Sequence, residues 1–196
     1  IIENHPEHFW IFSEKEYTWN DIYQKNRNPL LGWGGVDGMK TGWTTEAGYG
    51  LIASAERDGR RLVGVIAGAK TPDERAKEMR ALLDWGFHEF EIIEPCSSQS
   101  FDVAVANAVV DTEKVVTKTR CPLLVERGTK VGDEIKVEAI LTEPIVAPVE
   151  RDSLVGIAVV SRDGEELAQV DLTTSSDIPA LTFLQRVKLS IGLGVD

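Results

Sequence analysis

Residue types that build metal centres and disulfide scaffolds are scarce in this chain of 196 residues. Its two cysteines, Cys96 and Cys121, are too few for a disulfide scaffold and lack metal-ligand spacing. The three histidines, His5, His8 and His88, are scattered, so neither a metal site nor a histidine base is indicated. The sequence therefore predicts no metal ion and no cofactor.

The two cysteines leave two alternatives open. In an oxidising compartment they could form a disulfide, but the sequence does not supply the geometry that a bridge needs. Otherwise they are two separate small residues in a core, which is the interpretation that the sequence favours.

Positive charge and long apolar runs are lacking as well. The chain has 21 Lys and Arg against 32 Asp and Glu, a net charge of −11, which argues against a nucleic-acid binder. No run of eighteen apolar residues occurs, so the sequence predicts no membrane-spanning helix. The 42% hydrophobic and 27% charged residues are typical of a globular protein, and the length of 196 residues suffices for one ordinary domain or two small ones.

Two apolar runs, residues 49–55 and 61–69, predict adjacent antiparallel strands. The segment between them contains Asp58-Gly59, which suits the left-handed backbone angles of a tight hairpin turn. Both runs are apolar on both faces, so we expect helices on both sides of the sheet.

The clearest helix follows these runs. Thr71 has the hydroxyl of an N-cap, Pro72 suits the first helical position, and Glu74 completes a capping box. Gly86 is expected to weaken or end the helix. The apolar stripe at helical spacing consists of Ala76, Met79, Leu82, Leu83, Phe87 and Phe90.

The N-terminal segment is aromatic. Residues 9–17 predict a strand, and Tyr17, Trp19 and Tyr23 are most simply packed in a core or against a subdomain. Asn28-Pro29 is a turn signal.

The triplet Lys40-Thr41-Gly42, followed by Trp43, is the one short motif with chemical content. The lysine offers a fixed positive charge, the threonine offers a hydroxyl donor, and the glycine leaves room for a substrate. The backbone N–H of Trp43 could form one arm of an oxyanion hole. Taken alone the triplet is a weak signal, because a surface strand with an ordinary lysine would look the same.

The residues around the triplet change that interpretation, because together they resemble the low-molecular-mass penicillin-binding proteins. These are serine D-alanyl-D-alanine carboxypeptidases of the S11 peptidase type. The resemblance covers residues 7–92 closely, and the remainder resembles the β-rich C-terminal domain of the same family. It is carried by Asn26-Arg27-Asn28-Pro29-Leu30-Leu31, Val36-Asp37-Gly38-Met39-Lys40-Thr41-Gly42, Ala47-Gly48-Tyr49 and Leu82-Leu83-Asp84-Trp85-Gly86-Phe87.

The resemblance implies roles for the residues of the triplet. Lys40 would supply electrostatics and help proton transfer, Thr41 would hold the substrate carboxylate, and Gly42 would let the substrate approach. The N–H of Trp43 would share the oxyanion. The family usually has a smaller or polar residue at this position, which leaves the pocket shape and the rate open, whereas the oxyanion role needs only the backbone N–H.

Two arginines are also implied as substrate contacts. Arg75 would bind the terminal carboxylate of a D-Ala-D-Ala peptide, for which a planar guanidinium is well shaped. From the residues alone, a positive charge in the first turn of a helix could instead pair with Asp73 or Glu74. Arg27 lies in the Asn-Arg-Asn segment, which the resemblance places near the mouth of the active site as a substrate or structural contact.

The two other motifs of this family are absent. Its members attack with the serine of Ser-x-x-Lys and use a second motif, Ser-x-Asn. No serine in the chain has Lys three residues on or Asn two residues on. Because both motifs precede the Lys-Thr-Gly strand in this family, we expect the chain to be the C-terminal portion of a longer enzyme. That portion is expected to be inactive by itself and to have the missing N-terminal segment as a partner.

Short runs rich in Val, Ile and Thr follow Glu94-Pro95 and are separated by turn signals. They predict a sandwich-like all-β domain over residues 93–179. It follows part of an α/β (α+β) domain of the β-lactamase and transpeptidase type over residues 1–92, with an antiparallel sheet and a covering helix. Residues 180–196 form a short tail that resembles a remnant of an amphipathic membrane anchor. The runs are 101–110, 113–119, 123–126, 133–141, 145–149, 154–160 and 166–172.

The resemblance implies an enzyme that removes the terminal D-Ala from peptidoglycan stem peptides through an acyl-enzyme and that binds β-lactam antibiotics. It implies a periplasmic location at the outer face of the inner membrane, with peripheral contact through the tail. Two alternatives remain. The missing nucleophile is compatible with a non-catalytic cell-wall binding or scaffold module, and the serine motif family also includes β-lactamases, against which the appended β domain weighs.

Overall fold

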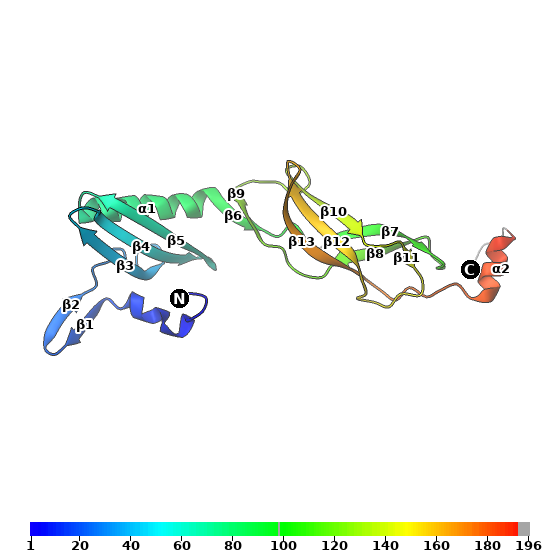
Figure 1. Ribbon diagram of the computed structural model, residues 1–196, viewed down its shortest axis with the longest axis horizontal. Coiled ribbons are helices and arrows are strands. Elements are labelled where there is room, and N and C mark those ends of the chain that lie inside the picture. The colour runs from blue at the N-terminus through cyan, green and yellow to red at the C-terminus, as the bar shows by residue number, and fades with distance from the viewer. Residues whose placement is uncertain (98, 192–196) are drawn as a thin grey trace. The chain divides into compact units, whose positions relative to one another are not determined.

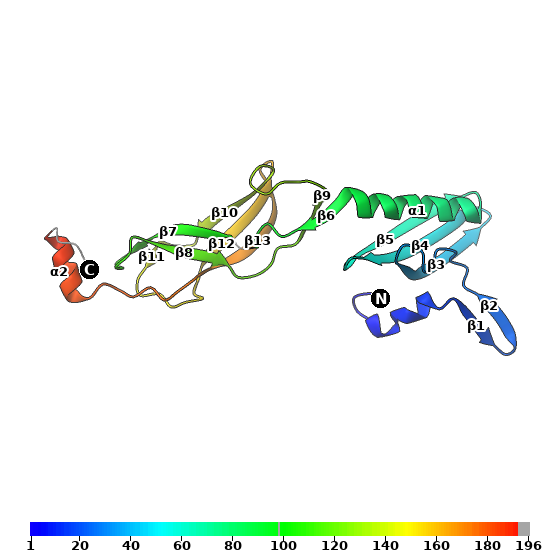
Figure 2. The same ribbon diagram turned by 180° about the vertical axis from the view of Figure 1, so that it is seen from behind.

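The computed structural model describes residues 1–97 and 99–191. The chain forms two compact units, Ile1–Glu91 and Ile92–Asp196, and Figures 1 and 2 show their elements from opposite sides. The structure combines mostly antiparallel sheets with a few helices, which confirms the mixed α and β fold class.

The first unit is centred on a three-stranded antiparallel sheet, with the helix α1 (Pro72–Glu89) lying across one face (Figure 1). The strand order is β3 (Val36–Thr44), β4 (Gly48–Arg57) and β5 (Arg60–Ala69). Asp58 and Gly59 form the turn between β4 and β5 and have φ angles of 51° and 75°. These left-handed angles confirm the predicted hairpin.

Helix α1 packs on the sheet through a small apolar core. Met79 and Leu83 of α1 are fully buried against Leu51, Ala53 and Ala55 of β4. Side chains alternate between the two faces of a strand, so one residue in two of β4 faces this helix.

The ends of α1 differ in how well they were predicted. Thr71 is the N-cap, because its hydroxyl accepts a hydrogen bond from the N–H of Glu74 at 3.0 Å. The carboxylate of Glu74 accepts from the N–H of Lys70 at 2.6 Å, one residue earlier than a capping box requires. Gly86 does not end the helix. A Cβ at this position would lie 2.8 Å from Leu62 of β5, so the glycine permits close packing of helix on sheet.

The opposite face of the sheet is covered at one end. There the 3₁₀ helix η1 (Pro6–Ser13) places Phe9 against Gly38 of β3. Further along this face Ile52, Val63 and Val65 are 38%, 55% and 62% exposed. The prediction of a covering helix is therefore confirmed for the face that packs against α1. On the other face, the described residues leave the side chains of Ile52, Val63 and Val65 exposed.

A hairpin of β1 (Glu16–Trp19) and β2 (Ile22–Lys25) follows η1. The strand predicted over residues 9–17 is wrong for most of its length, since η1 occupies residues 6–13. Tyr17, Trp19 and Tyr23 do not lie in a core, because they are 61%, 70% and 53% exposed. A two-stranded ribbon has no layer of its own against which to bury them. Their packing against another subdomain stays a prediction.

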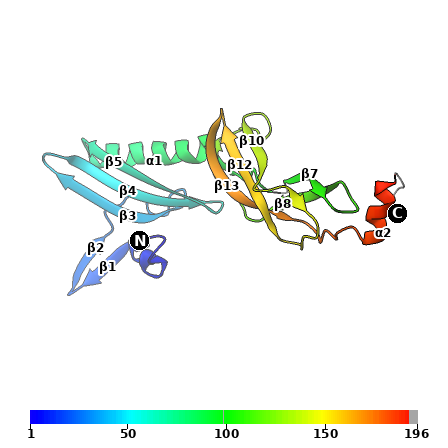
Figure 3. The same ribbon diagram turned by 45° about the vertical axis from the view of Figure 1, so that its right-hand side comes forward.

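The second unit is built on a six-stranded sheet in the order β10-β12-β13-β8-β7-β11, of which Figure 3 labels every strand except β11. Neighbouring strands are antiparallel except β7 and β11, which are parallel. Each of the seven predicted runs has a counterpart among the strands. They are β7 (Ser100–Ala106), β8 (Thr112–Thr117), β9 (Leu123–Glu126), β10 (Ile135–Leu141), β11 (Ile145–Val146), β12 (Leu154–Arg162) and β13 (Glu165–Thr174), and β9 pairs separately with β6 (Phe90–Ile93).

Cys96 and Cys121 form a disulfide in this unit, with their Cα atoms 5.7 Å apart. Both residues are buried in the core of the unit. The interpretation as two separate small residues is therefore wrong, because the fold brings the two positions within the distance that a bridge requires.

The segment after β13 is held along the unit by a row of backbone hydrogen bonds. The N–H groups of Ser175, Ile178 and Leu181 donate to the carbonyls of Lys114, Val149 and Asn107 at 3.1, 2.8 and 2.8 Å. The tail helix α2 (Phe183–Ser190) begins directly after this row, with Thr182 as N-cap. Among the described residues no helix is both long and apolar enough to cross a membrane. The predicted tail also included residues 192–196, which lie outside the described residues.

Candidate active site

The Lys-Thr-Gly segment lies on β3 at the edge of the three-stranded sheet, where β4 is its strand partner. An edge strand has backbone N–H and C=O groups that no ladder occupies. Thr41 stands opposite the buried Leu51, and Lys40 stands opposite Ile52. Because side chains alternate along a strand, Thr41 lies on the side of α1 and Lys40 on the open face.

Five of the six predicted site residues border one cavity of about 520 Å³. They come from three segments of the first unit: the loop before β3, the end of β3 and the first turn of α1. Lys40 does not line the cavity. Its side chain is exposed, and its Nζ donates to the carbonyl of Thr41. The lining residues are Arg27, Thr41, Gly42, Trp43, Tyr49 and Arg75, with Pro72 at the start of α1.

Arg75 is a buried cation in this cavity, only 5% exposed. Its Nη1 and Nη2 donate to the carbonyls of Gly50 and Arg27 over long distances of 3.3 and 3.4 Å. Its Nε is buried and has no hydrogen-bond partner within the described chain. The ion pair with Asp73 or Glu74 that the sequence left open does not form there. A buried guanidinium without a carboxylate is costly, so the site has an unmet preference for an anion.

Tyr49 links Trp43 to Arg75. Tyr49 stands directly opposite Trp43 in the β3–β4 register, and their ring centroids are 5.8 Å apart. The Arg75 guanidinium lies 5.8 Å from the centroid of the Tyr49 ring, within the range of a cation–π contact. Tyr49 was not among the site residues predicted from the sequence. Because the two aromatic residues are equidistant from the turn over residues 44–48, hairpin pairing was the signal that could have identified it.

Arg27 is carried by a loop that asparagine side chains hold in place. Asn28 is buried, and its Nδ2 donates to the carbonyl of Gly38 at 2.9 Å. The Oδ1 of Asn28 accepts from Leu30, and the Oδ1 of Asn26 accepts from Asn28. This fixes the backbone of Arg27 so that its carbonyl reaches Arg75, while its side chain stays exposed. The part played by Asn28 was also missed, although Asn-x-Asn is typical of Asx turns.

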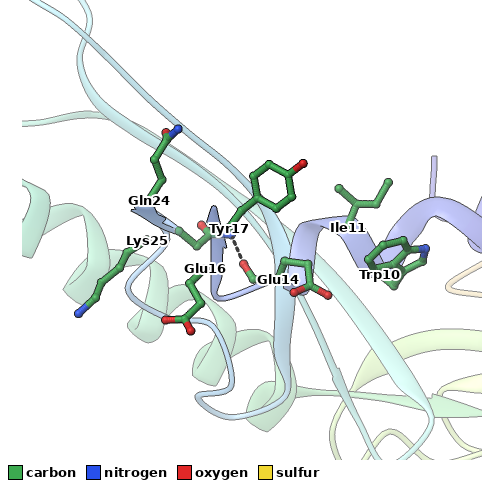
Figure 4. Close-up of a pocket in the computed structure, with 8 residues that line it drawn as sticks. Trp10, Ile11, Glu14, Glu16, Tyr17, Gln24 and Lys25 are labelled. Atoms are coloured by element: carbon green, nitrogen blue, oxygen red, sulfur yellow. Dashed lines mark hydrogen bonds between the residues drawn. The ribbon is translucent and has the colours of Figure 1, made fainter. Parts of the chain in front are cut away.

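A second cavity, of about 580 Å³, lies beside η1 and the β1–β2 hairpin (Figure 4). Trp10 and Tyr17 border it together with acidic and basic side chains. Nearby, the hydroxyl of Tyr23 donates to Glu16 at 2.5 Å, which raises the pKa of Tyr23 above its usual value. None of the predicted site residues lines this cavity. In the part of the chain that the structure describes, no group of His, Cys, Asp and Glu is arranged to hold a metal ion.

Family models match both units of the chain. The model described as D-alanyl-D-alanine carboxypeptidase matches residues 1–71. The model described as the C-terminal domain of penicillin-binding protein 5 matches residues 98–180.

Individual relatives match nearly the whole chain. D-alanyl-D-alanine carboxypeptidase DacC of Escherichia coli (strain K12) is 36% identical over 193 residues, which are 95% of this chain and 48% of that protein. Penicillin-binding protein 5 from Haemophilus influenzae is 33% identical with a TM-score of 0.64, covering 91% of this chain and 53% of that one. Penicillin-binding protein 6B from Escherichia coli is 30% identical with a TM-score of 0.62, covering 88% of this chain and 46% of that one.

The chain thus spans about half the length of the curated relatives it matches. Its fold agrees with theirs, and the two family models match its two units in the same order. The chain therefore belongs to the D-alanyl-D-alanine carboxypeptidase family of penicillin-binding proteins.

Proposed function

We propose that the cavity beside β3 holds the terminal carboxylate of a D-Ala-D-Ala peptide in a serine-type carboxypeptidase. The observation that carries this proposal is the buried Arg75 guanidinium, which has no carboxylate partner and an unsatisfied Nε in the described chain. Thr41 and Arg27 border the same cavity. A carboxylate is the anion that a planar guanidinium binds best, and both the peptidoglycan stem peptide and β-lactam antibiotics supply one.

The proposed reaction is acyl transfer. A serine supplied by the preceding part of the enzyme attacks the carbonyl of the penultimate D-Ala, and the terminal D-Ala leaves with a proton. Water then hydrolyses the ester. The N–H of Trp43 stabilises the oxyanion, and Gly42 leaves room for the peptide beside the edge strand. Lys40 faces the open side of the sheet, so its charge acts from the side on which the serine must arrive.

We further propose that a segment carrying Ser-x-x-Lys and Ser-x-Asn packs on this open face. Ile52, Val63 and Val65 support the proposal, because they form an apolar strip that the described residues leave exposed. Burying such side chains contributes about 1.5–3 kcal/mol each. The relatives are about twice as long as this chain, which leaves room for such a segment.

Localisation in the periplasm, at the outer face of the inner membrane, belongs to the same proposal. The Cys96–Cys121 disulfide supports an oxidising compartment. Helix α2 exposes Phe183 and Leu184 and carries Arg186 and Lys188, which supports weak peripheral contact with a lipid surface.

Labelling with a fluorescent penicillin tests the proposed reaction. The intact enzyme should be labelled under native conditions and should lose the label after heat denaturation, whereas the 196-residue chain alone should stay unlabelled because its serines lie outside the nucleophile motif. An intact enzyme that fails to react would remove the assignment. If the unreactive enzyme binds isolated peptidoglycan, the result would favour the scaffold alternative. Rapid hydrolysis of penicillin by the enzyme would favour a β-lactamase.

A further inference from the structure

The carboxylate cavity has an aromatic wall that carboxylate binding by itself does not require. Trp43 of β3 and Tyr49 of β4 form this wall, and each borders the cavity. Trp43 is 58% exposed although it is a large apolar side chain, and it borders the same cavity as Arg27 and Arg75. Beside it, Gly42 borders the same cavity with its backbone alone.

Tyr49 contacts both the wall and the buried cation. Its ring lies 5.8 Å from the Trp43 ring and 5.8 Å from the Arg75 guanidinium. The long hydrogen bonds of Arg75, at 3.3 and 3.4 Å, hold its guanidinium only weakly. The Tyr49 ring is therefore a third contact that fixes the position of this guanidinium, through the electrostatic attraction between a cation and the negative face of a ring.

We propose that Tyr49 is a positioning residue for Arg75 and that Trp43 and Tyr49 select an apolar side chain on the substrate residue that carries the free carboxylate. The inference rests on the proposed carboxylate site and adds the residues that set its specificity. A residue bound to Arg75 through its carboxylate places its own side chain one or two bonds away, against the two rings. Terminal alanine gains apolar contact there, and terminal glycine does not.

The cavity volume is consistent with this division of roles. About 520 Å³ exceeds the need of one carboxylate and falls in the range of cavities that take a drug-sized ligand. Burial of the alanine methyl group should strengthen binding about fourfold relative to glycine. Loss of the ring contact to Arg75 should weaken binding of every carboxylate ligand about tenfold.

The test uses the Arg75 Nε–H signal in nuclear magnetic resonance spectra of the ¹⁵N-labelled 196-residue chain, identified by its disappearance in Arg75→Lys. The ligands are N-acetyl-D-Ala-D-Ala, N-acetyl-D-Ala-Gly, which lacks only the terminal methyl group, and the amide of the first peptide, which lacks the carboxylate. The wild-type chain should bind the first about fourfold more tightly than the second, and the amide should leave the signal in place.

The variants separate the two roles in the proposal. Trp43→Ser should bring the ratio between the alanine and glycine ligands close to one. Tyr49→Leu should weaken both ligands about tenfold, whereas Tyr49→Phe, which keeps the ring, should stay within about twofold of the wild type. The backbone spectrum of each variant shows whether β3 and β4 keep their fold.

The outcomes distinguish this inference from the proposed function. An unchanged alanine preference in Trp43→Ser, or equal binding by Tyr49→Leu and Tyr49→Phe, would overturn the inference and leave the carboxylate site standing. A wild-type signal that no ligand moves, or that the amide moves as strongly as the acid, would refute the carboxylate site, and the proposed wall with it.

Discussion

Breaking the Cys96–Cys121 disulfide should destabilise the second unit and leave the first unchanged. The bridge links positions 25 residues apart, and both cysteines lie in the core of the second unit. In the chain-entropy account, closing a loop of this length restricts the unfolded chain by about 3.5 kcal/mol at room temperature. That amounts to a change of roughly 300-fold in the equilibrium constant of unfolding.

The distribution of aromatic residues provides separate probes for the two units. All five tryptophans and all three tyrosines lie within residues 1–91. In urea denaturation, tryptophan fluorescence therefore reports the first unit, and far-ultraviolet circular dichroism reports both. The double variant Cys96→Ala/Cys121→Ala should shift the dichroism transition of the second unit to lower urea by about 2 M, with the fluorescence transition unmoved.

Reduction of the wild-type chain is the matched control, because free thiols keep the side-chain volume that alanine removes. Reduction should reproduce the shift in the wild type and have no effect on the double variant. A second-unit transition that loses less than the roughly 2 kcal/mol typical of a native disulfide would refute this reasoning. An equal shift of the fluorescence transition would refute it too.

Three further predictions concern single residues. Arg75→Gln in the intact enzyme should lower kcat/KM for a D-Ala-D-Ala peptide by at least about thirtyfold, as expected for lost charge-assisted hydrogen bonds, and unchanged steady-state kinetics would contradict the assigned role. Gly156→Ala should destabilise the second unit by more than about 2 kcal/mol in urea denaturation, because the new Cβ would lie 2.2 Å from the Ile140 carbonyl oxygen. The control Gly42→Ala, whose Cβ meets nothing within 4 Å, should leave stability unchanged. The raised pKa of Tyr23 comes from the bond that its protonated hydroxyl donates to Glu16, so this bond stabilises the fold below the ordinary tyrosine pKa and is lost as the pH rises through the raised value. Tyrosinate absorbance should titrate at lower pH in Glu16→Gln, and an identical midpoint would show that the carboxylate is not the cause.

Local rules of sequence predicted the regular elements well. The left-handed angles at Asp58 and Gly59 and the N-cap at Thr71 follow from the chemistry of those residues alone, so few tertiary contacts were needed to predict them. The strands of the second unit were visible because β-branched runs alternate with turn residues. The prediction over residues 9–17 failed because aromatic side chains suit a strand equally well, whereas residues 6–13 form a 3₁₀ helix whose Phe9 lies against Gly38 of β3.

The sequence predicted which residues form the candidate site better than it predicted how they are arranged in space. The motif and the resemblance named five residues that border one cavity. The residues next to Arg75 in the sequence do not predict its burial. An arginine in the first turn of a helix usually stays in solvent and pairs with a neighbouring acidic side chain. The disulfide was missed for a related reason: a bridge across 25 residues depends on how the sheet folds, which no local pattern encodes.

The row of backbone bonds that holds the segment before α2 determines how the second unit would respond to a mechanical load. A force applied to the tail helix reaches the bond of Leu181 first, then the pair at Ile178, then Ser175. Bonds loaded one after another yield at lower force than bonds sheared together, so this border should peel open stepwise while the broad pairing of β12 with β13 remains intact. A pull on α2 should therefore lengthen the segment before it while the sheet of the second unit stays folded.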